Sequence, residues 1–151
     1  MPTKFEGTEI EKKALNAYIN LLRASESITH EFDLKLQSED GMTMSELGIL
    51  EALKHFGALQ PKDICLKILK TKGNVSFHLK SLLAKKWIKK NQIKLDARAY
   101  SVSLTKEGKK KIVKAFKSHA NRILERFSIL TMDEQELLRN LCRKVGKQIS
   151  G

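Results

Sequence analysis

Residues 71–104 decide the fold, and they read TKGNVSFHLKSLLAKKWIKKNQIKLDARAYSVSL. Thr71 is a helix-capping residue type, and an apolar face with helical spacing follows it. This pattern predicts a helix over about 72–85, with Val75, Leu79 and Leu82 on its inner face. The opposite face is mostly polar and basic, and it contains Lys72, Gly73, Asn74, Ser76, Phe77 and Lys80.

The remainder of this stretch has the pattern of a β-hairpin. Residues 87–90 read as a short strand, and residues 99–104 alternate between apolar and polar side chains. A polar, basic tip over 91–98 lies between them. A hairpin directly after a basic helix is the position of a wing beside a recognition helix.

Two short helices are predicted upstream. Thr43 and Glu46 have the spacing of a capping box, and the helix they open ends at Phe56 and Gly57. Pro61 suits the first turn of the next helix. The apolar side of that second helix is expected to be Ile64, Cys65, Ile68 and Leu69. Three short helices followed by a hairpin predict a winged helix-turn-helix.

Longer helical patterns lie on both sides of this region. An apolar stripe over about 8–37 predicts a long helix with a bend near 25–29. Thr105 can cap a basic helix that runs to about Phe127. Thr131 and Glu134 repeat the capping-box spacing and open a last helix, whose apolar stripe is Leu137, Leu138, Leu141, Cys142, Val145 and Ile149. The predicted fold class is mainly α with a small β-hairpin wing.

The basic residues are concentrated in the middle of the chain. Residues 62–117 contain 17 of the 29 basic residues but only three of the 17 acidic ones, a local net charge of +14. The rest of the chain is close to neutral. Nucleic acid, an anionic membrane or an acidic protein would each suit such a region, whereas a merely solvated lysine surface would not require this contrast.

The composition excludes several classes of protein. The 151 residues make about one domain, and the apolar runs are too short to span a bilayer. The first residues contain no apolar signal segment, so a cytoplasmic location is expected. Cys65 and Cys142 show no metal-ligand spacing and lie on apolar stripes, which predicts buried, reduced thiols. No cofactor motif or catalytic constellation is present, so no cofactor, metal or enzymatic activity is expected.

The sequence resembles the MarR family of winged-helix regulators from about Thr43 to Gly108. Members carry Asp-x-Arg at the wing tip and then Leu-Thr-x-x-Gly at a fixed distance; here these are Asp96-Ala-Arg98 and Leu104-Thr105-Lys-Glu-Gly108. Residues 82–88 and 63–71 also resemble the family's pattern. Lys86 stands where members usually have Gly, which predicts a different turn into the wing. Phe77 stands where polar or basic residues are common.

The resemblance implies three regions: an N-terminal dimerisation helix (1–40), a winged helix-turn-helix DNA-binding region (43–105) and C-terminal dimerisation helices (106–151). It further implies a homodimer that binds a pseudo-palindromic operator in double-stranded DNA, usually as a repressor, with no membrane partner. Many members lose DNA affinity when a small anionic or phenolic effector binds, or when a cysteine is oxidised.

The candidate DNA-binding residues lie on the recognition helix and the wing. Arg98 would enter the minor groove, with Asp96 orienting it or shaping the wing. Asn74 would pair with adenine, while Phe77 would either touch thymine methyl groups or pack on a neighbouring element. The complete candidate set is Thr71, Lys72, Asn74, Ser76, Phe77, Lys80, Lys89, Lys90, Lys94, Asp96 and Arg98. The lysines of this set, and those of 106–111, would mostly contact phosphates.

An effector pocket is expected between the first helix and the winged region. Its walls would be Tyr18, Leu22, Ser25, Leu50, Lys54 and Phe56, which would suit a small aromatic anion; the same residues could instead form interdomain core. Two other functions remain open at this point. One is a sequence-tolerant nucleic-acid or chromatin-binding protein, and the other is an interaction module for an acidic protein.

Overall fold

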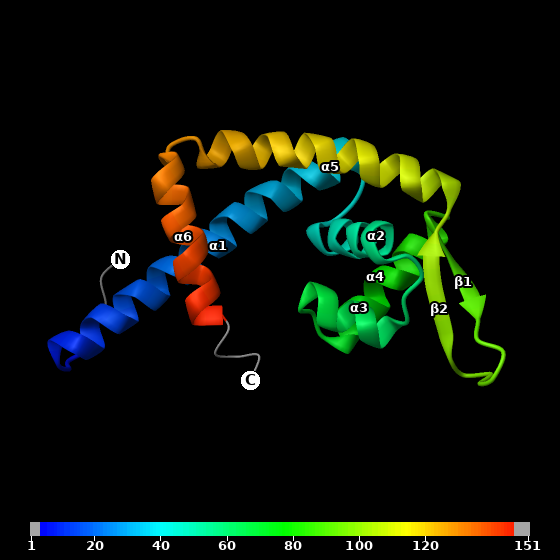
Figure 1. Ribbon diagram of the computed structural model, residues 1–151, viewed down its shortest axis with the longest axis horizontal. Helices are drawn as coiled ribbons and strands as arrows, with labels where there is room; N and C mark the ends of the chain where they lie inside the picture. The colour runs from blue at the N-terminus through cyan, green and yellow to red at the C-terminus, as the bar shows by residue number, and fades with distance from the viewer. Residues whose placement is uncertain (1–3, 147–151) are drawn as a thin grey trace. The chain divides into compact units, whose positions relative to one another are not determined.

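The computed structural model describes residues 4–146, and these form six helices and one two-stranded antiparallel sheet (Figure 1). The elements in chain order are α1 (Glu9–Asp40), α2 (Met44–Phe56), α3 (Pro61–Ile68), α4 (Lys72–Ala84), β1 (Ile88–Gln92), β2 (Tyr100–Leu104), α5 (Lys106–Phe127) and α6 (Met132–Gly146). The predicted order of four helices, a hairpin and two helices is confirmed.

Threonine caps set the starts of most helices. The Thr43 hydroxyl accepts a hydrogen bond from the Glu46 backbone N–H, while Glu46 accepts one from the Thr43 N–H, so the predicted capping box is present. Thr131 and Glu134 form the same pair at α6. A further capping box, not among those predicted, opens α1, where hydrogen bonds from the Thr8 backbone and side chain lower the pKa of Glu11.

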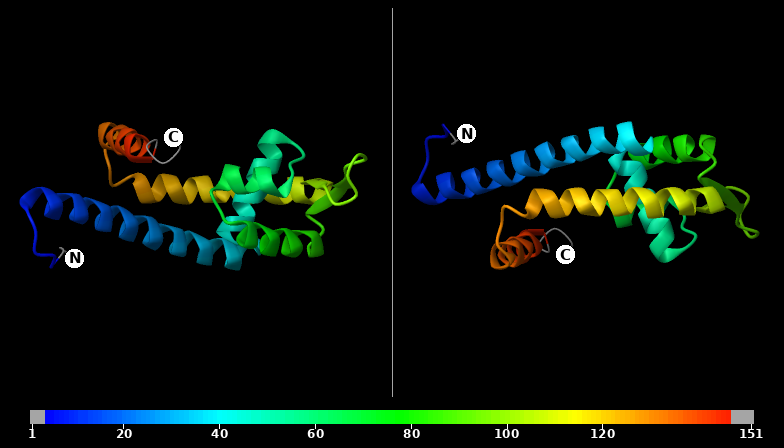
Figure 2. Two further views of the ribbon diagram at one scale, coloured as in Figure 1. Left: turned by 90° about the horizontal axis from the view of Figure 1, so that it is seen from below. Right: turned by 90° about the horizontal axis from the view of Figure 1, so that it is seen from above.

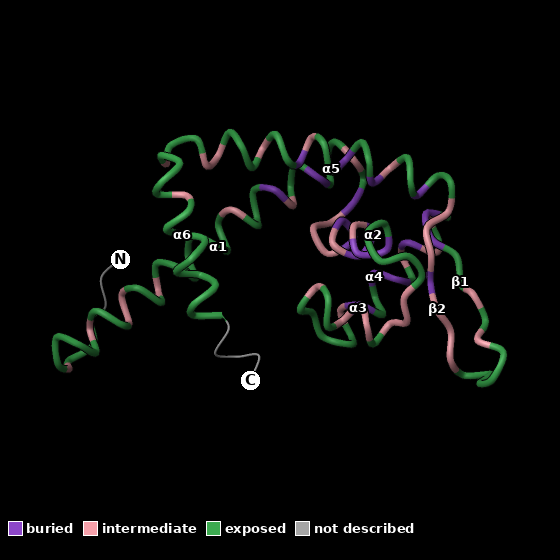
Figure 3. Tube along the Cα trace, in the orientation of Figure 1, coloured by how far each residue is buried: buried purple, intermediate pink, exposed green. Residues whose placement is uncertain are grey.

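The core lies between α2, α3, α4 and the hairpin. The predicted inner face of α4 is buried: Val75, Leu79 and Leu82 pack in one cluster with Leu47, Leu50 and Leu53 of α2. Figure 3 shows this burial concentrated in the short helices and at the base of the hairpin, whereas most of α1 and α6 is exposed. Leu36 of α1 and Ile112 and Ala115 of α5 are fully buried in this cluster, whereas α6 has no buried residue in the single chain.

Leu69 does not belong to the apolar side of α3, and that prediction is wrong. The helix ends at Ile68, and Leu69 adopts a left-handed backbone conformation with a φ of 53°. Its side chain is 88% exposed. Because the left-handed residue turns the chain toward α4, Leu69 leaves the helical period that places Ile64 in the core.

Lys86 preserves the turn that a glycine would make, so the predicted difference at this turn is wrong. Its φ is 59°, in the left-handed region. The Trp87 N–H donates to the Leu82 carbonyl and the Lys86 N–H donates to the Leu83 carbonyl. These are the two hydrogen bonds of a Schellman motif, which ends α4 and directs the chain into β1.

The Leu-Thr-x-x-Gly motif joins the wing to α5. The Thr105 hydroxyl accepts the Gly108 N–H and donates to the Lys86 carbonyl, while the Thr105 N–H donates to the Trp87 carbonyl. A Cβ on Gly108 would lie 1.9 Å from that same carbonyl oxygen. The glycine is therefore required because the backbone of Trp87 lies directly against the first turn of α5.

The hairpin is held on both sides. Its strands pair from Ile88 with Leu104 to Gln92 with Tyr100, slightly further than the predicted first strand. Leu59, between α2 and α3, exchanges two backbone hydrogen bonds with Val102 on the other edge of β2. Both edges of β2 are thus paired, which fixes the wing to the helix-turn-helix.

The chain divides into two compact units, one up to Phe116 and one from Lys117 onward. In the first unit, α1 is one helix, as predicted, and it continues without interruption through residues 25–29, where a bend was expected (Figure 2). No helix within residues 4–146 combines the length and apolarity needed to cross a membrane. Ile149, the last residue of the predicted stripe, lies outside the described residues.

Candidate nucleic-acid interface

One face of α4 is open to solvent. Thr71, Lys72, Ser76, Phe77 and Lys80 are all exposed, whereas the opposite face is buried in the core. A Cβ on Gly73 would meet nothing within 4 Å, so this face is not covered at its first turn either. The outward face expected from the sequence is present, with Asn74 at its margin as a half-buried residue.

Two contacts attach α4 to the start of α2. His78 is 9% exposed, and its Nδ1 lies 3.4 Å from the Thr43 hydroxyl oxygen. Lys85 donates to Glu46 Oε2 at 2.8 Å and to the Gly41 carbonyl at 2.9 Å. The orientation of α4 therefore depends on the junction between α1 and α2.

Sequence reasoning missed the second of these contacts. Glu46 was recognised only as a capping residue, and Lys85 only as one of many lysines. No local pattern relates two residues that are 39 positions apart. The Lys85 ammonium also lies 5.0 Å from the centroid of the Trp87 ring, which Lys111 approaches at 5.4 Å.

The amide oxygen of Asn74 does not face solvent, as the adenine-pairing hypothesis would require. Its backbone N–H donates to the Thr71 hydroxyl. Its side-chain Oδ1 is buried and has no hydrogen-bond partner within the described part of the chain. Bidentate pairing needs both amide atoms at the base edge, so the side chain of Asn74 would have to rotate outward.

The wing presents lysines on both of its faces. Lys89 pairs with Ser103 and Lys90 with Val102, and adjacent residues of a strand point to opposite sides. The Lys90 ammonium lies 4.3 Å from the centroid of the Tyr100 ring. Lys94 is exposed in the tip. Cations on both faces suit an element that enters a groove between two phosphate backbones.

Asp96 shapes the tip and leaves the Arg98 side chain unpaired. The Asp96 carboxylate accepts a hydrogen bond from the Arg98 backbone N–H at 2.9 Å. The backbone N–H of Ala99 donates to the Asp96 carbonyl, which closes the turn. Across residues 4–146 the exposed guanidinium of Arg98 has no ion-pair partner. Of the two roles considered for Asp96, this geometry supports the structural one.

The six residues predicted to line the effector pocket differ widely in their exposure to solvent. Leu50 is fully buried in the core, whereas Tyr18 and Phe56 are 61% and 51% exposed. The Phe56 ring carries the Lys67 ammonium 4.0 Å from its centroid, and Lys54 lies 5.9 Å from the Phe116 ring. Leu22 is also exposed, and only Ser25 lines the polar hollow described next.

That hollow, of about 530 Å³, lies between α1, the start of α2 and α4. On the wall of this hollow, Asp33 Oδ1 accepts a hydrogen bond from the Met44 N–H at 2.7 Å. The contact between Thr43 and His78 lies on the same wall. Its lining is polar and of mixed charge, and it comprises Ser25, Glu26, Thr29, His30, Asp33, Thr43, Met44, Ser45, Lys70 and His78.

The cysteines and histidines form no site of their own. Within residues 4–146 no group of three or more His, Cys, Asp or Glu residues is placed to hold a metal ion. Cys65 is partly buried against the core, but Cys142 is exposed, so the prediction of a buried thiol is wrong there. The stripe that carries Cys142 on α6 has no buried residue in the single chain.

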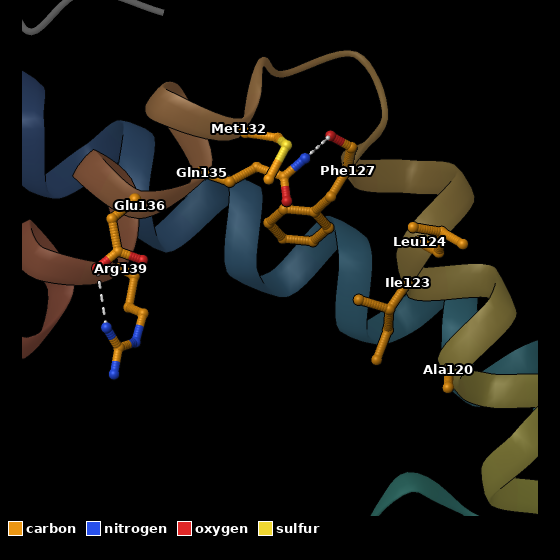
Figure 4. A pocket seen from close by; sticks show the side chains of 8 residues that line it. All are labelled: Ala120, Ile123, Leu124, Phe127, Met132, Gln135, Glu136 and Arg139. Atoms are coloured by element: carbon orange, nitrogen blue, oxygen red, sulfur yellow. Dashed lines mark hydrogen bonds and ion pairs between the residues drawn. The ribbon is translucent and has the colours of Figure 1, made fainter.

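A second hollow lies within the unit that begins at Lys117 (Figure 4). It also measures about 530 Å³ and is formed by the end of α5 and the start of α6. Gln135 spans the turn between these helices by donating to the Phe127 and Leu130 carbonyls. The lining is mainly apolar with a polar rim: Ala120, Ile123, Leu124, Phe127, Met132, Gln135, Glu136 and Arg139.

The sequence matches a known protein family and a bacterial relative. Residues 40–99 match the model of the MarR family. The chain is 31% identical over 146 residues to the uncharacterised HTH-type transcriptional regulator YkoM of Bacillus subtilis (strain 168), covering 97% of this chain and 94% of that protein.

Solved structures of the same fold include DNA-bound and ligand-regulated proteins. Sco3205, a MarR family transcriptional regulator from Streptomyces coelicolor solved in complex with DNA, aligns with a TM-score of 0.85 at 19% identity, covering 98% of this chain and 93% of that one. BpsR of Bordetella bronchiseptica, whose DNA binding is regulated by 6-hydroxynicotinic acid, aligns with a TM-score of 0.78 at 20% identity over 86% and 98%.

Proposed function

Because the chain belongs to the MarR family of winged helix-turn-helix transcriptional regulators, we propose that it represses transcription by binding a pseudo-palindromic operator as a homodimer. Membership of a regulator family also confirms the expectation that the chain is not an enzyme. The observation that carries the proposal is the open, cationic face of α4 beside a wing whose Arg98 side chain is exposed and unpaired. In such proteins the helix enters the major groove and the wing enters the minor groove.

Operator selection from random duplexes tests this function. The purified chain should enrich a two-fold symmetric sequence and bind it at least about 10³-fold more tightly than a scrambled duplex at one salt concentration. If a dimer neutralises about 6–10 phosphates, log affinity should fall with log salt at a slope of roughly −5 to −9. Equal affinity for both duplexes would favour the sequence-tolerant alternative, and no binding to any duplex would favour an acidic protein partner.

The dimer is supported by apolar surface that the single chain leaves open. On α1, Tyr18, Leu21 and Leu22 are each more than 40% exposed, as are Leu137 and Leu141 on α6. Exposed apolar surface of this extent is typical of an interface. Sedimentation of the full chain should show a dimer at micromolar concentration, and a monomer under those conditions would contradict the proposal.

A small-molecule effector would act between α1 and the winged region. The 6-hydroxynicotinic acid of BpsR is a small aromatic acid, and it is a suitable first probe together with salicylate. His30→Ala changes only the polar hollow, whereas Tyr18→Ala changes only the walls expected from the sequence. The variant that no longer loses DNA affinity on adding the compound locates the site. If neither compound weakens DNA binding of the parent, effector relief by this class is excluded.

A further inference from the structure

Phe77 is exposed where the helix-turn-helix would meet a base edge. It lies on α4, and 71% of its surface is open to solvent. The alternative that Phe77 packs on a neighbouring helix or on the wing is excluded by this exposure. Scattered exposed apolar residues are common on protein surfaces, but Phe77 lies inside the region of net charge +14, next to the exposed Lys80.

The surroundings of Phe77 leave room for a base pair. Gly73 lies four residues before Phe77, so it is the neighbour of Phe77 one turn earlier on the same helix. A Cβ at Gly73 would meet no atom within 4 Å. The helix surface at Gly73 therefore carries no side chain and is not covered by the Phe77 ring, so another molecule can approach the backbone there closely.

The ring is also supported from one side. Its centroid lies 5.1 Å from that of the His78 ring, edge to face at 85°. His78 in turn is nine-tenths buried and contacts the hydroxyl of Thr43. A phenylalanine has only two side-chain torsions, so a ring resting on an anchored neighbour loses little freedom when a partner covers it.

The chemistry of the ring restricts what it can recognise. It has no hydrogen-bonding atom, so it cannot pair with the donors and acceptors of guanine, cytosine or adenine. The one apolar group in the major groove is the C5-methyl of thymine. The lysines on the same face, Lys72 and Lys80, can hold the helix in the groove through phosphates without reading sequence.

We propose that Phe77 determines specificity by packing on the 5-methyl group of a thymine in each operator half-site. This inference rests on the proposed DNA-binding function. In this proposal the apolar side chain of Phe77 recognises the methyl group of the base. The same half-site position should therefore accept 5-methylcytosine better than cytosine.

Replacement of thymine by deoxyuridine tests the proposal, because it removes the methyl group and keeps the base pair. The selected operator is prepared with this replacement at one symmetric pair of positions at a time. Parent protein should lose about tenfold in affinity at one such pair, since about one buried methyl group is lost per half-site. Phe77→Ala should bind the thymine operator more weakly and show no thymine preference there, whereas Phe77→Leu should retain part of it.

Leu66→Ala is the matched control. Leu66 is an apolar residue of α3 that is 75% exposed, and its variant should keep the full thymine preference. If parent protein binds the thymine and deoxyuridine operators equally at every position, or if Phe77→Ala keeps the preference, the inference is overturned. Failure of the proposed function is distinguishable, because the parent would then not select or bind the unmodified thymine operator.

Discussion

The ammonium group of Lys85 lies 2.8 Å from Glu46 Oε2 and so ties the end of α4 to the first turn of α2. The Glu46 side chain is 2% exposed, and the same oxygen also accepts the N–H of Thr43. A single carboxylate thus caps one helix and anchors another. The orientation of the recognition helix is coupled to the junction that follows α1.

Loss of the Lys85 charge should therefore destabilise the fold. Lys85→Met should lower the free energy of unfolding by about 1–3 kcal/mol, because it leaves the Glu46 carboxylate buried with fewer partners. The value is below that of a fully buried pair because 32% of the Lys85 side chain is exposed. Urea unfolding measures it. Lys12→Met is the control, since Lys12 contacts Glu9 at 3.6 Å and 82% of the Glu9 side chain is exposed. That surface pair should contribute less than about 1 kcal/mol, and equal effects of the two variants would contradict the argument.

Replacing Lys86 by glycine should stabilise the protein. Its left-handed backbone is unfavourable for a residue with a Cβ, so Lys86→Gly should raise the free energy of unfolding by about 0.5–1 kcal/mol. Lys89→Gly in β1 is the control. It should lower the free energy of unfolding, because a glycine inside a strand weakens the strand. Thermal unfolding of the two variants tests this, and a destabilised Lys86→Gly variant would refute it.

Replacement by alanine should change the free energy of unfolding in opposite directions at Gly108 and Gly73. Gly108→Ala places a methyl group against the Trp87 carbonyl and should cost about 1–3 kcal/mol of unfolding free energy through displaced backbone. Gly73→Ala meets open space in a helix and should be neutral or stabilising by about 0.5 kcal/mol. Both are measured by denaturant unfolding without DNA. A tolerated Gly108→Ala variant would show that the junction of the wing with α5 can relax.

Arg98 should contribute sequence-dependent affinity, while Lys89 should not. Arg98→Ala should weaken operator binding by about 1–3 kcal/mol, most strongly where the flanks are A·T-rich, because a narrow minor groove attracts the guanidinium. Lys89→Ala should weaken operator and scrambled DNA to the same extent, because phosphates are the same in every sequence. Titrations with both duplexes at one salt concentration check this. An Arg98→Ala variant with parental affinity would show that the wing does not read DNA.

His119 should make stability depend on pH. Burial, and then repulsion from Arg122, lower the pKa of His119 from 6.5. The neutral form is therefore favoured in the folded state. The contribution of neutral His119 to the free energy of unfolding is complete above pH 6.5. It should fall as the pH drops from 6.5 toward the folded-state pKa, because the unfolded chain then binds the proton first. His119→Gln should reduce this dependence, whereas His55→Gln, at an exposed position, should keep it; an unchanged profile in His119→Gln would assign the effect elsewhere.

Local signals determined much of the architecture. The capping threonines, the proline at the start of α3 and the apolar periods act within a few residues, so they predict helix starts and inner faces without knowledge of distant contacts. The wing motif Asp96-x-Arg98 and the charge of 62–117 similarly indicate a DNA-binding hairpin and helix from the sequence alone. Phe77 was also identified, with two possible roles.

Only the tertiary structure decided how these elements are joined. The ion pair of Lys85 with Glu46, the approach of Trp87 to Gly108 and the exposure of Phe77 depend on contacts between residues far apart in the chain. Periodicity places a side chain on a face, but it does not say whether another element covers that face. Cys142 lies on such an uncovered face of α6 and is exposed, whereas Leu69 is exposed because α3 ends one residue before it.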